Sequence, residues 1–324
     1  MGIRIIGTGA YVPPKNVSNY DLSLTLDTSD EWIRSHTGVG NRYITEDGMQ
    51  CSDLAAEAAR NVLAETGTSA KDIDLIIVAT ATSDYSGFPS TACLVQEKIG
   101  ASSAGAFDLS AACTGFIYGL ETAANFLRSK SSNRVLLIGS EVFSRILDWT
   151  DRSTCVLFGD GAGAVLIEIT DDDSDMLFSV LRSKGEGSSY LYHGSGGTYR
   201  PAVNEKPLEE NLYMNGREVY IFAVNACMEI IDELKKSSGL SQKDFKYIVP
   251  HQANAKILQA ISKRSGIPMD VFYMNIEHYA NTSAASIPIA LNEMNEKGLL
   301  ERGDILLTVG FGGGLTYGGN IIRW

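Results

Sequence analysis

Short apolar runs alternate with segments of helical period in the first half of the chain. Residues 73–82 (IDLIIVATAT) are apolar and rich in β-branched side chains, which predicts a buried strand. Residues 52–65 before it place apolar side chains on one face of a helix. The same patterns then predict, in order, a strand at 106–110, a helix at 114–128, a strand at 134–139 and a glycine-interrupted hairpin at 154–169.

The second half repeats this order of elements. Helical spacing covers residues 218–236 and 254–264, and short apolar runs predict strands at 245–250, 271–275 and 304–310. An acidic run, DDDSD at 171–175, lies between the halves, and we take it as a solvated loop at a domain boundary. The sequence therefore predicts a duplicated α/β architecture with an N-terminal half, residues 1–172, and a C-terminal half, residues 173–324.

Composition and charge narrow the class of protein. The chain has 324 residues and a net charge of −12, which disfavours a general nucleic-acid binder because such a protein needs a basic surface. The first residues, MGIRII, lack the apolar stretch of a signal peptide, and no apolar run reaches membrane-spanning length. The five cysteines are scattered and form no C-x-x-C pair, so we expect neither disulfides nor a zinc site, and a cytosolic setting without a membrane.

Cys113 has the sequence context of a nucleophile. The predicted strand ends near Ser110, and a helix begins near Cys113. The backbone N–H groups and positive dipole at a helix N-terminus stabilise a thiolate and lower the pKa of a thiol. The small neighbours in AACTG leave room for a substrate. A free Cys is also often a small buried apolar residue, so position alone leaves the two interpretations open.

His251 and Asn281 are further candidates for chemistry. His251 follows the predicted strand 245–250, and open α/β sheets place ligands at the C-terminal ends of their strands. A lone His is usually structural, but this one is among only four in the chain. Asn281 lies in a loop of small polar residues, HYANTSAAS, where it could simply be a turn residue.

The order Cys, His, Asn also occurs in papain-like proteases. His251 follows Cys113 by 138 positions, within the range of roughly 130–150 in that class. However, the protease flank C-G-[SA]-C-[WY] is absent, and the surrounding β-α-β pattern does not fit. We therefore reject a protease.

Neither of two glycine-rich segments matches a known nucleotide-binding motif. Residues 159–163 have the spacing G-x-G-x-G rather than the dinucleotide fingerprint, and the chain has no P-loop motif. The segment FGGG at 311–314 follows a predicted strand and could direct backbone N–H groups at a ligand or form a tight turn between strands.

Taken together, these motifs resemble those of the β-ketoacyl-acyl-carrier-protein synthase III family, which initiates bacterial type II fatty acid synthesis. The resemblance runs in order along essentially the whole chain. It rests on AACTG around Cys113, PHQAN from 250, NTSAAS from 281, FGGG from 311, DTSDEWI from 27 and FGDGAG from 158. It implies a thiolase-like fold, with two α/β halves in a five-layer αβαβα sandwich, and a homodimer.

The resemblance also implies a decarboxylative Claisen condensation without a cofactor or a metal. An acyl-CoA primer, often acetyl-CoA, acylates Cys113, and malonyl-acyl carrier protein then loses CO2 and attacks the thioester. His251 and Asn281 are expected to donate hydrogen bonds to the malonyl thioester oxygen and stabilise the enolate. The backbone N–H groups of Cys113 and Gly313 are the expected oxyanion hole for acyl transfer.

Binding residues follow from the same resemblance and from the neighbouring sequence. Trp32 and Arg152 match the pair that stacks on the CoA adenine, as an aromatic ring and a guanidinium can. The other expected CoA contacts are Thr28, Gly216 and Asn254. Phe88 matches a residue that crosses the dimer interface into the partner's acyl pocket, and the other expected pocket residues are Leu147, Phe158 and Phe311.

The carrier protein is acidic, so an enzyme with a charge of −12 needs a local basic surface to bind it. Residues 251–266 contain three basic side chains and no acidic one. Lys263 and Arg264 also suit the C-terminal end of a helix, where cations are favoured. The expected carrier-binding residues are Gln252, Ala253, Asn254, Ala255, Lys256, Lys263 and Arg264.

Three positions depart from the family pattern. His36 replaces an Arg common near the CoA phosphates, Ile221 replaces a Lys found in some docking surfaces, and Thr114 follows Cys113 where Ala is common. The sequence leaves the primer open, because one methylene in an apolar pocket changes binding by only about 1–3 kcal/mol. A relative in secondary metabolism and a non-catalytic binding subunit remain alternatives, whereas the second Cys of thiolases and the Glu acid/base of HMG-CoA synthase are not evident.

Overall fold

Two mixed β-sheets form the frame of the molecule. The structure, a computed structural model, describes residues 2–170, 176–199 and 209–324. The first sheet has the order β1 (Gly2–Tyr11), β7 (Gly161–Thr170), β6 (Arg134–Glu141), β4 (Leu75–Ala79) and β5 (Gly105–Leu109). The second has the order β11 (Tyr247–Pro250), β12 (Ile305–Gly312), β13 (Thr316–Arg323) and β8 (Met176–Ser183).

The parallel strands lie where the β-α-β pattern predicts them. β4 pairs in parallel with both β5 and β6, and β11 pairs in parallel with β12. The remaining pairs, β1 with β7, β6 with β7, β12 with β13 and β13 with β8, are antiparallel. All five residues of β4 are buried, as expected of a central parallel strand covered on both faces.

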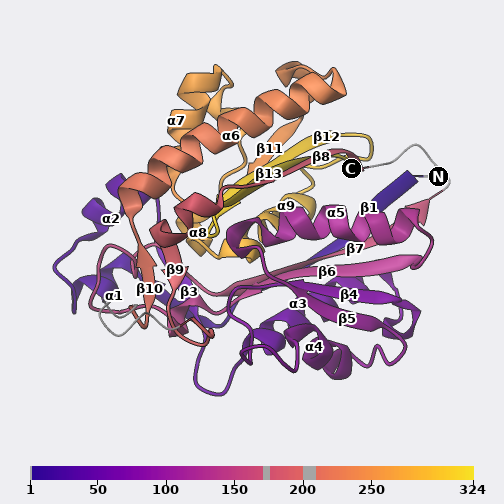
Figure 1. Ribbon diagram of the computed structural model, residues 1–324, viewed down its shortest axis with the longest axis horizontal. Helices are drawn as coiled ribbons and strands as arrows, with labels where there is room; N and C mark the ends of the chain where they lie inside the picture. Colours follow the sequence, from indigo (N-terminus) through magenta and orange to yellow (C-terminus); the bar gives the residue numbers. More distant parts are fainter. Residues whose placement is uncertain (1, 171–175, 200–208) are drawn as a thin grey trace.

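Helices cover both faces of each sheet, so the main chain forms five layers (Figure 1). α3 (Cys51–Thr66) and α4 (Thr91–Ile99) lie outside the first sheet. α5 (Gly115–Arg128) and α9 (Ser286–Glu296) lie between the sheets, and α6 (Gly216–Ser238) and α7 (Ala255–Ser265) cover the outer face of the second. The expected αβαβα sandwich is confirmed.

Short elements close one end of the sandwich. The small strands are β2 (Lys15–Ser18), β3 (Asn41–Ile44), β9 (Leu191–His193) and β10 (Leu212–Met214). The short helices are α1 (Asn19–Ser23), α2 (Asp30–Thr37) and α8 (Ile276–Tyr279). Turns of 3₁₀ type occupy Ala70–Asp72, Ala112–Thr114, Phe143–Arg145, Gly185–Tyr190, Gln242–Asp244, Met269–Val271 and Ser283–Ala285. Every helix in the described ranges is too short or too polar to cross a lipid bilayer.

Two glycines bring the start of α9 directly onto the first sheet. Gly139 on β6 and Gly163 on β7 are register partners. A Cβ at Gly139 would lie 2.3 Å from the backbone oxygen of Ala284, and one at Gly163 would lie 2.6 Å from the backbone nitrogen of Ile289. Only glycine allows this approach, which fixes the loop before α9 against the ends of the strands.

The structure corrects two predicted elements. Residues 154–160 form turns rather than the first strand of a hairpin, and only Gly161–Thr170 is a strand. The apolar character of 154–160 reflects burial in the wall of a pocket, where Phe158 forms an isolated bridge with Asn281. Residues 271–275 are not a strand, since a 3₁₀ turn ends at Val271 and one bridge, Ile248 with Phe272, is all the pairing they make. The acidic run at the expected domain boundary lies outside the described residues, so the boundary at 172 stays a prediction.

Candidate active site

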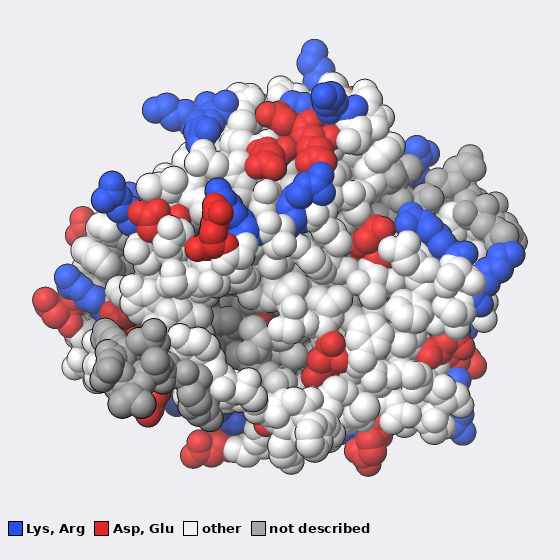
Figure 2. Space-filling view, in the orientation of Figure 1, with Lys and Arg blue, Asp and Glu red and all other residues white. Residues whose placement is uncertain are grey.

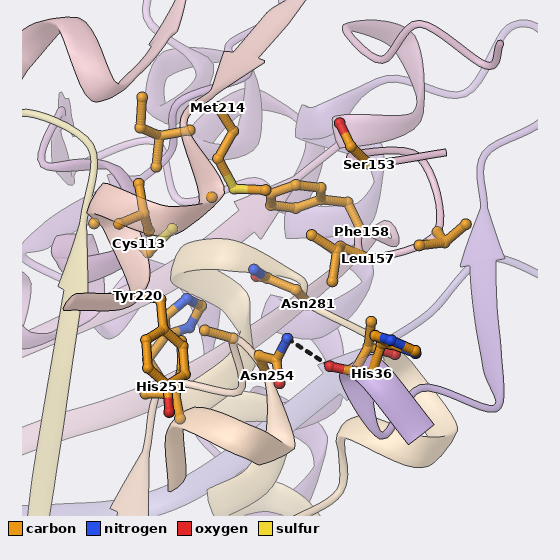
Figure 3. Close-up of a pocket in the computed structure, with 18 of the residues that line it drawn as sticks. His36, Cys113, Ser153, Leu157, Phe158, Met214, Tyr220, His251, Asn254 and Asn281 are labelled. Atoms are coloured by element: carbon orange, nitrogen blue, oxygen red, sulfur yellow. Dashed lines mark hydrogen bonds between the residues drawn. The ribbon is translucent and has the colours of Figure 1, made fainter. Parts of the chain in front are cut away.

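One pocket of about 230 Å³ collects the candidate catalytic residues from both halves of the chain. Its lining includes Cys113, His251 and Asn281, which are 30 or more positions apart in sequence. Figure 3 shows the three side chains facing the same space. The sequence prediction that they act together is therefore consistent with their placement.

Cys113 lies at the junction of a strand and a central helix. The 3₁₀ turn Ala112–Thr114 leads directly into α5, so Cys113 precedes the helix N-terminus by two residues. Ala112 has a left-handed φ of 46°, a conformation that costs a non-glycine residue free energy and that is found mostly at functional sites. A Cβ at Gly312 would lie 2.7 Å from the backbone nitrogen of Cys113, so the glycine turn packs tightly against the nucleophile.

The expected low thiol pKa is not found in the resting site. Cys113 is only 6% exposed, and burial raises the pKa of its thiol to about 12. A hydrogen bond from the Ser283 hydroxyl, whose Oγ lies 3.4 Å from Sγ, opposes this shift, and the charge of Glu141 adds to it. Loss of water around a small thiol outweighs the stabilisation expected from the helix N-terminus. Cys113 therefore rests as a thiol and needs a proton acceptor when it reacts.

His251 is held as a neutral hydrogen-bond donor. Burial lowers the pKa of the imidazole to about 3, so it carries no charge at neutral pH. The backbone N–H of Gln252 donates to Ser286 Oγ, and this hydroxyl lies 2.8 Å from His251 Nδ1. The Gln252 N–H occupies one acceptor position of the hydroxyl, and when the hydroxyl donates its own proton to Nδ1 the ring proton lies on Nε2. Nε2 is buried, has no partner among the described residues, and is free to donate to a substrate oxygen.

Asn281 is oriented by the loop that carries it. Its side-chain oxygen accepts the backbone N–H of Ser283 at 2.8 Å, which leaves the Nδ2 amide group for the pocket. Its backbone N–H donates to Leu157 O, and its carbonyl accepts from Gly159 N–H. Asn281 is thus a fixed donor rather than only a turn residue.

The outer part of the pocket has the expected stacking pair. Trp32 and Arg152 both line it, and the Arg152 guanidinium lies 5.1 Å from the centre of the indole ring. His36 stacks on Trp32 with ring centres 4.3 Å apart. Asn254 and Gly216 also line the pocket, and Asn254 Nδ2 donates to the backbone oxygen of His36 (Figure 3). Thr28 is not among the lining residues, although its buried hydroxyl has no partner in the part of the chain that the structure describes.

Only some of the expected acyl-pocket residues line the pocket. Phe158 and Phe311 line the pocket. Leu147 is buried in the same apolar cluster as Phe158 but is not on the pocket wall. Phe143 stacks on Phe158 with ring centres 4.8 Å apart, so it packs against a residue of the pocket wall. Phe88 is 88% exposed and is not among the residues that line this chain's own pocket, so its expected role toward a partner stays a prediction.

The glycine turn places Gly312 nearer the nucleophile than Gly313. Gly312 lines the pocket, whereas a Cβ at Gly313 would meet Leu191 O at 3.3 Å and Ala112 Cβ at 3.6 Å. Gly313 thus lies beside the residue that precedes Cys113. The assignment of its N–H to an oxyanion hole stays a prediction.

The expected carrier-binding stretch is only partly accessible. Gln252, Ala253 and Ala255 are buried, and the Gln252 amide donates to Pro250 O and Tyr273 O. Their side chains therefore cannot make the direct carrier contacts expected of them. The exposed basic side chains Lys256, Lys263 and Arg264 lie on α7, with Asn254 at its N-cap. Figure 2 shows basic side chains over the α6 and α7 region, with an acidic group beside them.

Sequence reasoning missed three polar residues around the catalytic set. Ser286 touches His251, Ser283 touches Cys113, and Glu141 is a fully buried carboxylate. The motif NTSAAS contains both serines, but only the folded contacts reveal their partners. Within residues 2–170, 176–199 and 209–324, no group of three metal-ligating side chains comes together.

The arrangement defines an acyl-thioester transfer site: a thiol beside two fixed neutral donors, at the end of a channel that begins with stacked aromatic and guanidinium groups. Known proteins agree with this class. Residues 107–185 match the model for 3-oxoacyl-[acyl-carrier-protein (ACP)] synthase III, and residues 235–324 match the model for the C-terminal part of that protein. The chain belongs to the 3-oxoacyl-[acyl-carrier-protein] synthase III family, whose members are condensing enzymes.

Full-length relatives support this assignment. The chain is 48% identical over 323 residues to the β-ketoacyl-[acyl-carrier-protein] synthase III of Clostridium acetobutylicum, covering 99% of this chain and 98% of that protein. The crystal structure of the Aquifex aeolicus synthase III superposes with a TM-score of 0.93 at 42% identity and full coverage of both chains. The Thermus thermophilus synthase III gives a TM-score of 0.94 at 39% identity, covering 100% of this chain and 99% of that one.

Proposed function

We propose that this enzyme condenses an acyl-CoA primer, with acetyl-CoA the first choice, with malonyl-acyl carrier protein and so begins fatty acid synthesis. The observation that carries the proposal is the meeting of Cys113, His251 and Asn281 in one pocket. A thiol alone would support many acyl transfers. The two neutral donors beside it can give the hydrogen bonds that stabilise the oxygen of an enolate.

The first half-reaction acylates the thiol. The CoA adenine stacks between Trp32 and Arg152, which move apart from their present 5.1 Å separation to admit it, and the pantetheine passes Gly216 and Asn254 toward Cys113. The sulfur attacks the primer carbonyl, CoA leaves as the thiolate, and the acyl group remains on Cys113. The backbone N–H groups of Cys113 and Gly313 stabilise the oxyanion that forms during this step.

The second half-reaction makes the carbon–carbon bond. The His251 Nε2–H and the Asn281 amide donate to the thioester oxygen of the malonyl group, so that charge develops on an oxygen with two hydrogen bonds as CO2 leaves. The carbanion attacks the acyl thioester and displaces Cys113. A neutral His251 suits this role because its proton is shared with the enolate oxygen rather than lost to solvent.

Partners and setting are part of the proposal. The acidic carrier docks on Lys256, Lys263 and Arg264 of α7, with the surface charges providing orientation. A homodimer is supported by the loop around Phe88, because Tyr85 and Phe88, 54% and 88% exposed, give this loop an apolar surface that suits a partner. We further propose a cytosolic enzyme that needs no cofactor, with acyl-CoA as a substrate.

Intact-protein mass spectrometry tests the proposal. The enzyme is mixed with a panel of acyl-CoAs and then with malonyl-acyl carrier protein. An acyl adduct that maps to Cys113 and is discharged by the malonyl carrier is the expected result, and it identifies the primer. Cys113→Ala should form no adduct, and His251→Ala or Asn281→Ala should form the adduct without discharging it.

One structural neighbour favours a second candidate. A priming β-ketosynthase of the R1128 polyketide pathway superposes with a TM-score of 0.90 at 33% identity, covering 99% of this chain and 96% of that one. The same catalytic residues would serve a pathway of that kind. An adduct that persists with malonyl-acyl carrier protein but leaves with another acceptor would support it, and no adduct from any acyl-CoA would indicate a non-catalytic subunit.

A further inference from the structure

A buried carboxylate with no assigned role lies behind the nucleophile. Glu141 ends β6 and is 0% exposed. Its side chain accepts hydrogen bonds from Ala81 N–H at 3.1 Å and from Thr82 Oγ1 at 2.6 Å. Among the described residues it has no cationic partner within salt-bridge distance. A carboxylate buried with hydrogen bonds but no cation is costly to ionise, which makes its persistence here informative.

Ser283 connects this carboxylate to Cys113. Its hydroxyl lies 3.4 Å from Cys113 Sγ. The same side chain also interacts with the Glu141 carboxyl, and this interaction lowers the pKa of that carboxyl against the effect of burial. Ser283 is buried and has a left-handed φ of 50°, so the loop holds it beside Cys113 in an unfavourable backbone conformation. A hydroxyl proton rotates, so Ser283 can donate to either neighbour and accept from the other.

The pKa values of the resting site indicate that Cys113 needs a proton acceptor and that Glu141 suits this role better than His251. Cys113 rests as a thiol, because burial and the charge of Glu141 both raise its pKa. His251 is a poor proton acceptor, because burial lowers its pKa to about 3. Burial raises the pKa of Glu141 to about 7, which suits a group that must accept and return a proton near neutral pH.

We propose that Ser283 and Glu141 form a proton relay that takes the thiol proton of Cys113 during acylation and returns it during condensation. Ser283 is the catalytic residue of the relay because it touches the reacting sulfur, and Glu141 acts through it. This inference rests on the proposed function, since it concerns the acyl-Cys113 intermediate.

Atoms and charges balance in both directions. In acylation, the S–H bond of Cys113 breaks as the bond from sulfur to the primer carbonyl carbon forms. The thiol proton passes to Ser283 Oγ while the Ser283 proton passes to Glu141, and CoA leaves as a thiolate that takes a proton from solvent. In condensation, the malonyl carbanion displaces the Cys113 thiolate, and the proton returns from Glu141 through Ser283 to sulfur.

The relay also removes one negative charge from the site between acylation and condensation. While Glu141 holds the thiol proton it is neutral, so a malonyl group that binds in that state enters a pocket from which one negative charge has been removed. The donors to Glu141 from the loop after β4 hold the carboxyl group in place in both states. The other titratable groups around it are Cys51 on α3, whose pKa burial raises to about 12, and Asp84, whose carboxylate accepts from Ser52.

The test is the pH dependence of the acylation step alone. Single-turnover acylation by acetyl-CoA is followed by quenched mass spectrometry between about pH 5.5 and 9. The wild-type rate should rise with pH through an inflection near the Glu141 pKa of about 7, because the ionised carboxylate is the acceptor. Glu141→Gln and Ser283→Ala should each slow acylation at about pH 8 by roughly 100-fold and should each abolish the inflection.

Combined and conservative variants separate a relay from a structural role. The double variant should be no slower than either single variant, because residues that act as one unit have non-additive effects. Glu141→Asp keeps a carboxylate and should keep an inflection. Glu168→Gln is the matched control: it removes a carboxylate at the opposite end of the same β6–β7 pair, where Glu168 contacts Arg134, and it should acylate normally.

Two results would overturn the inference in different ways. If wild-type enzyme acylates Cys113 and folded Ser283→Ala keeps both its rate and its inflection, the relay is wrong while the proposed function stands. If wild-type enzyme takes up no acyl group from any acyl-CoA, the proposed function fails and the relay fails with it. Ser283→Ala carries the test even if Glu141→Gln does not fold, because it removes one hydroxyl and no charge.

Discussion

Ser286→Ala should impair condensation and spare acylation. Ser286 Oγ holds His251 Nδ1 at 2.8 Å and accepts the Gln252 backbone N–H, so it determines which ring nitrogen carries the proton. The substitution leaves Nδ1 buried without a partner and allows the proton to move to that nitrogen. The Nε2–H donor toward substrate is then present in only part of the molecules.

The size of the effect follows from one hydrogen bond. A buried hydrogen bond between neutral groups contributes roughly 0.5–1.5 kcal/mol, and about 1.4 kcal/mol corresponds to tenfold in an equilibrium. We therefore expect condensation to fall by up to about tenfold, well short of the roughly 100- to 1,000-fold expected when an oxyanion-stabilising donor is removed entirely, as in His251→Ala.

The assay measures the two half-reactions separately. Acyl transfer from acyl-CoA to Cys113 should proceed at the wild-type rate, whereas discharge by malonyl-acyl carrier protein should slow. Nitrogen NMR of the histidines, of which the chain has four, should show a change of tautomer at His251. Ser286→Thr keeps a hydroxyl and should keep the Nε2–H tautomer. Wild-type discharge by Ser286→Ala, with the tautomer unchanged, would refute the reasoning.

Three further predictions concern binding and packing. Trp32→Ala removes one stacking surface for the adenine and should raise KM for acyl-CoA by about tenfold with little change in kcat, because stacking on an aromatic side chain contributes roughly 1–3 kcal/mol per base; an unchanged KM would place the adenine elsewhere. Lys256→Glu should raise KM for malonyl-acyl carrier protein but not for acyl-CoA, and the difference should shrink as salt is added. Gly139→Ala should lower the free energy of unfolding by about 1–3 kcal/mol because the new Cβ would overlap the backbone oxygen of Ala284. Denaturant titration checks this, with Gly105→Ala, where the nearest atom is 3.5 Å away, as the control.

The sequence predicted elements whose signal is local. Helices at 52–65, 114–128, 218–236 and 254–264 are found within three residues of their expected ends, because a helix that packs on a sheet shows its buried face in the period of its own residues. The segment 154–160 was predicted wrongly for the opposite reason. Its apolar residues face a pocket formed by distant parts of the chain, and no periodicity distinguishes that surface from a strand.

In the candidate site, too, residues within recognisable local motifs could be predicted, whereas contacts between distant parts of the chain could not. The motifs around Cys113, His251 and Asn281 could be recognised within short windows, and the fold brings all three into one pocket. The partners of these residues could not be found that way. Glu141 is 142 positions from Ser283, and neither residue lies in a sequence context that distinguishes it from an ordinary strand end or loop.

The burial of Cys113 affects how readily its thiol is oxidised or alkylated. Peroxides and general electrophiles attack thiolates, and a thiol held neutral and 6% exposed offers them little thiolate and little access. We therefore expect Cys113 to react slowly with peroxides and small electrophiles in the resting enzyme. A covalent inhibitor should need an acyl-like shape that enters the pocket, and intrinsic reactivity alone should give little selectivity for this cysteine over the more exposed Cys93.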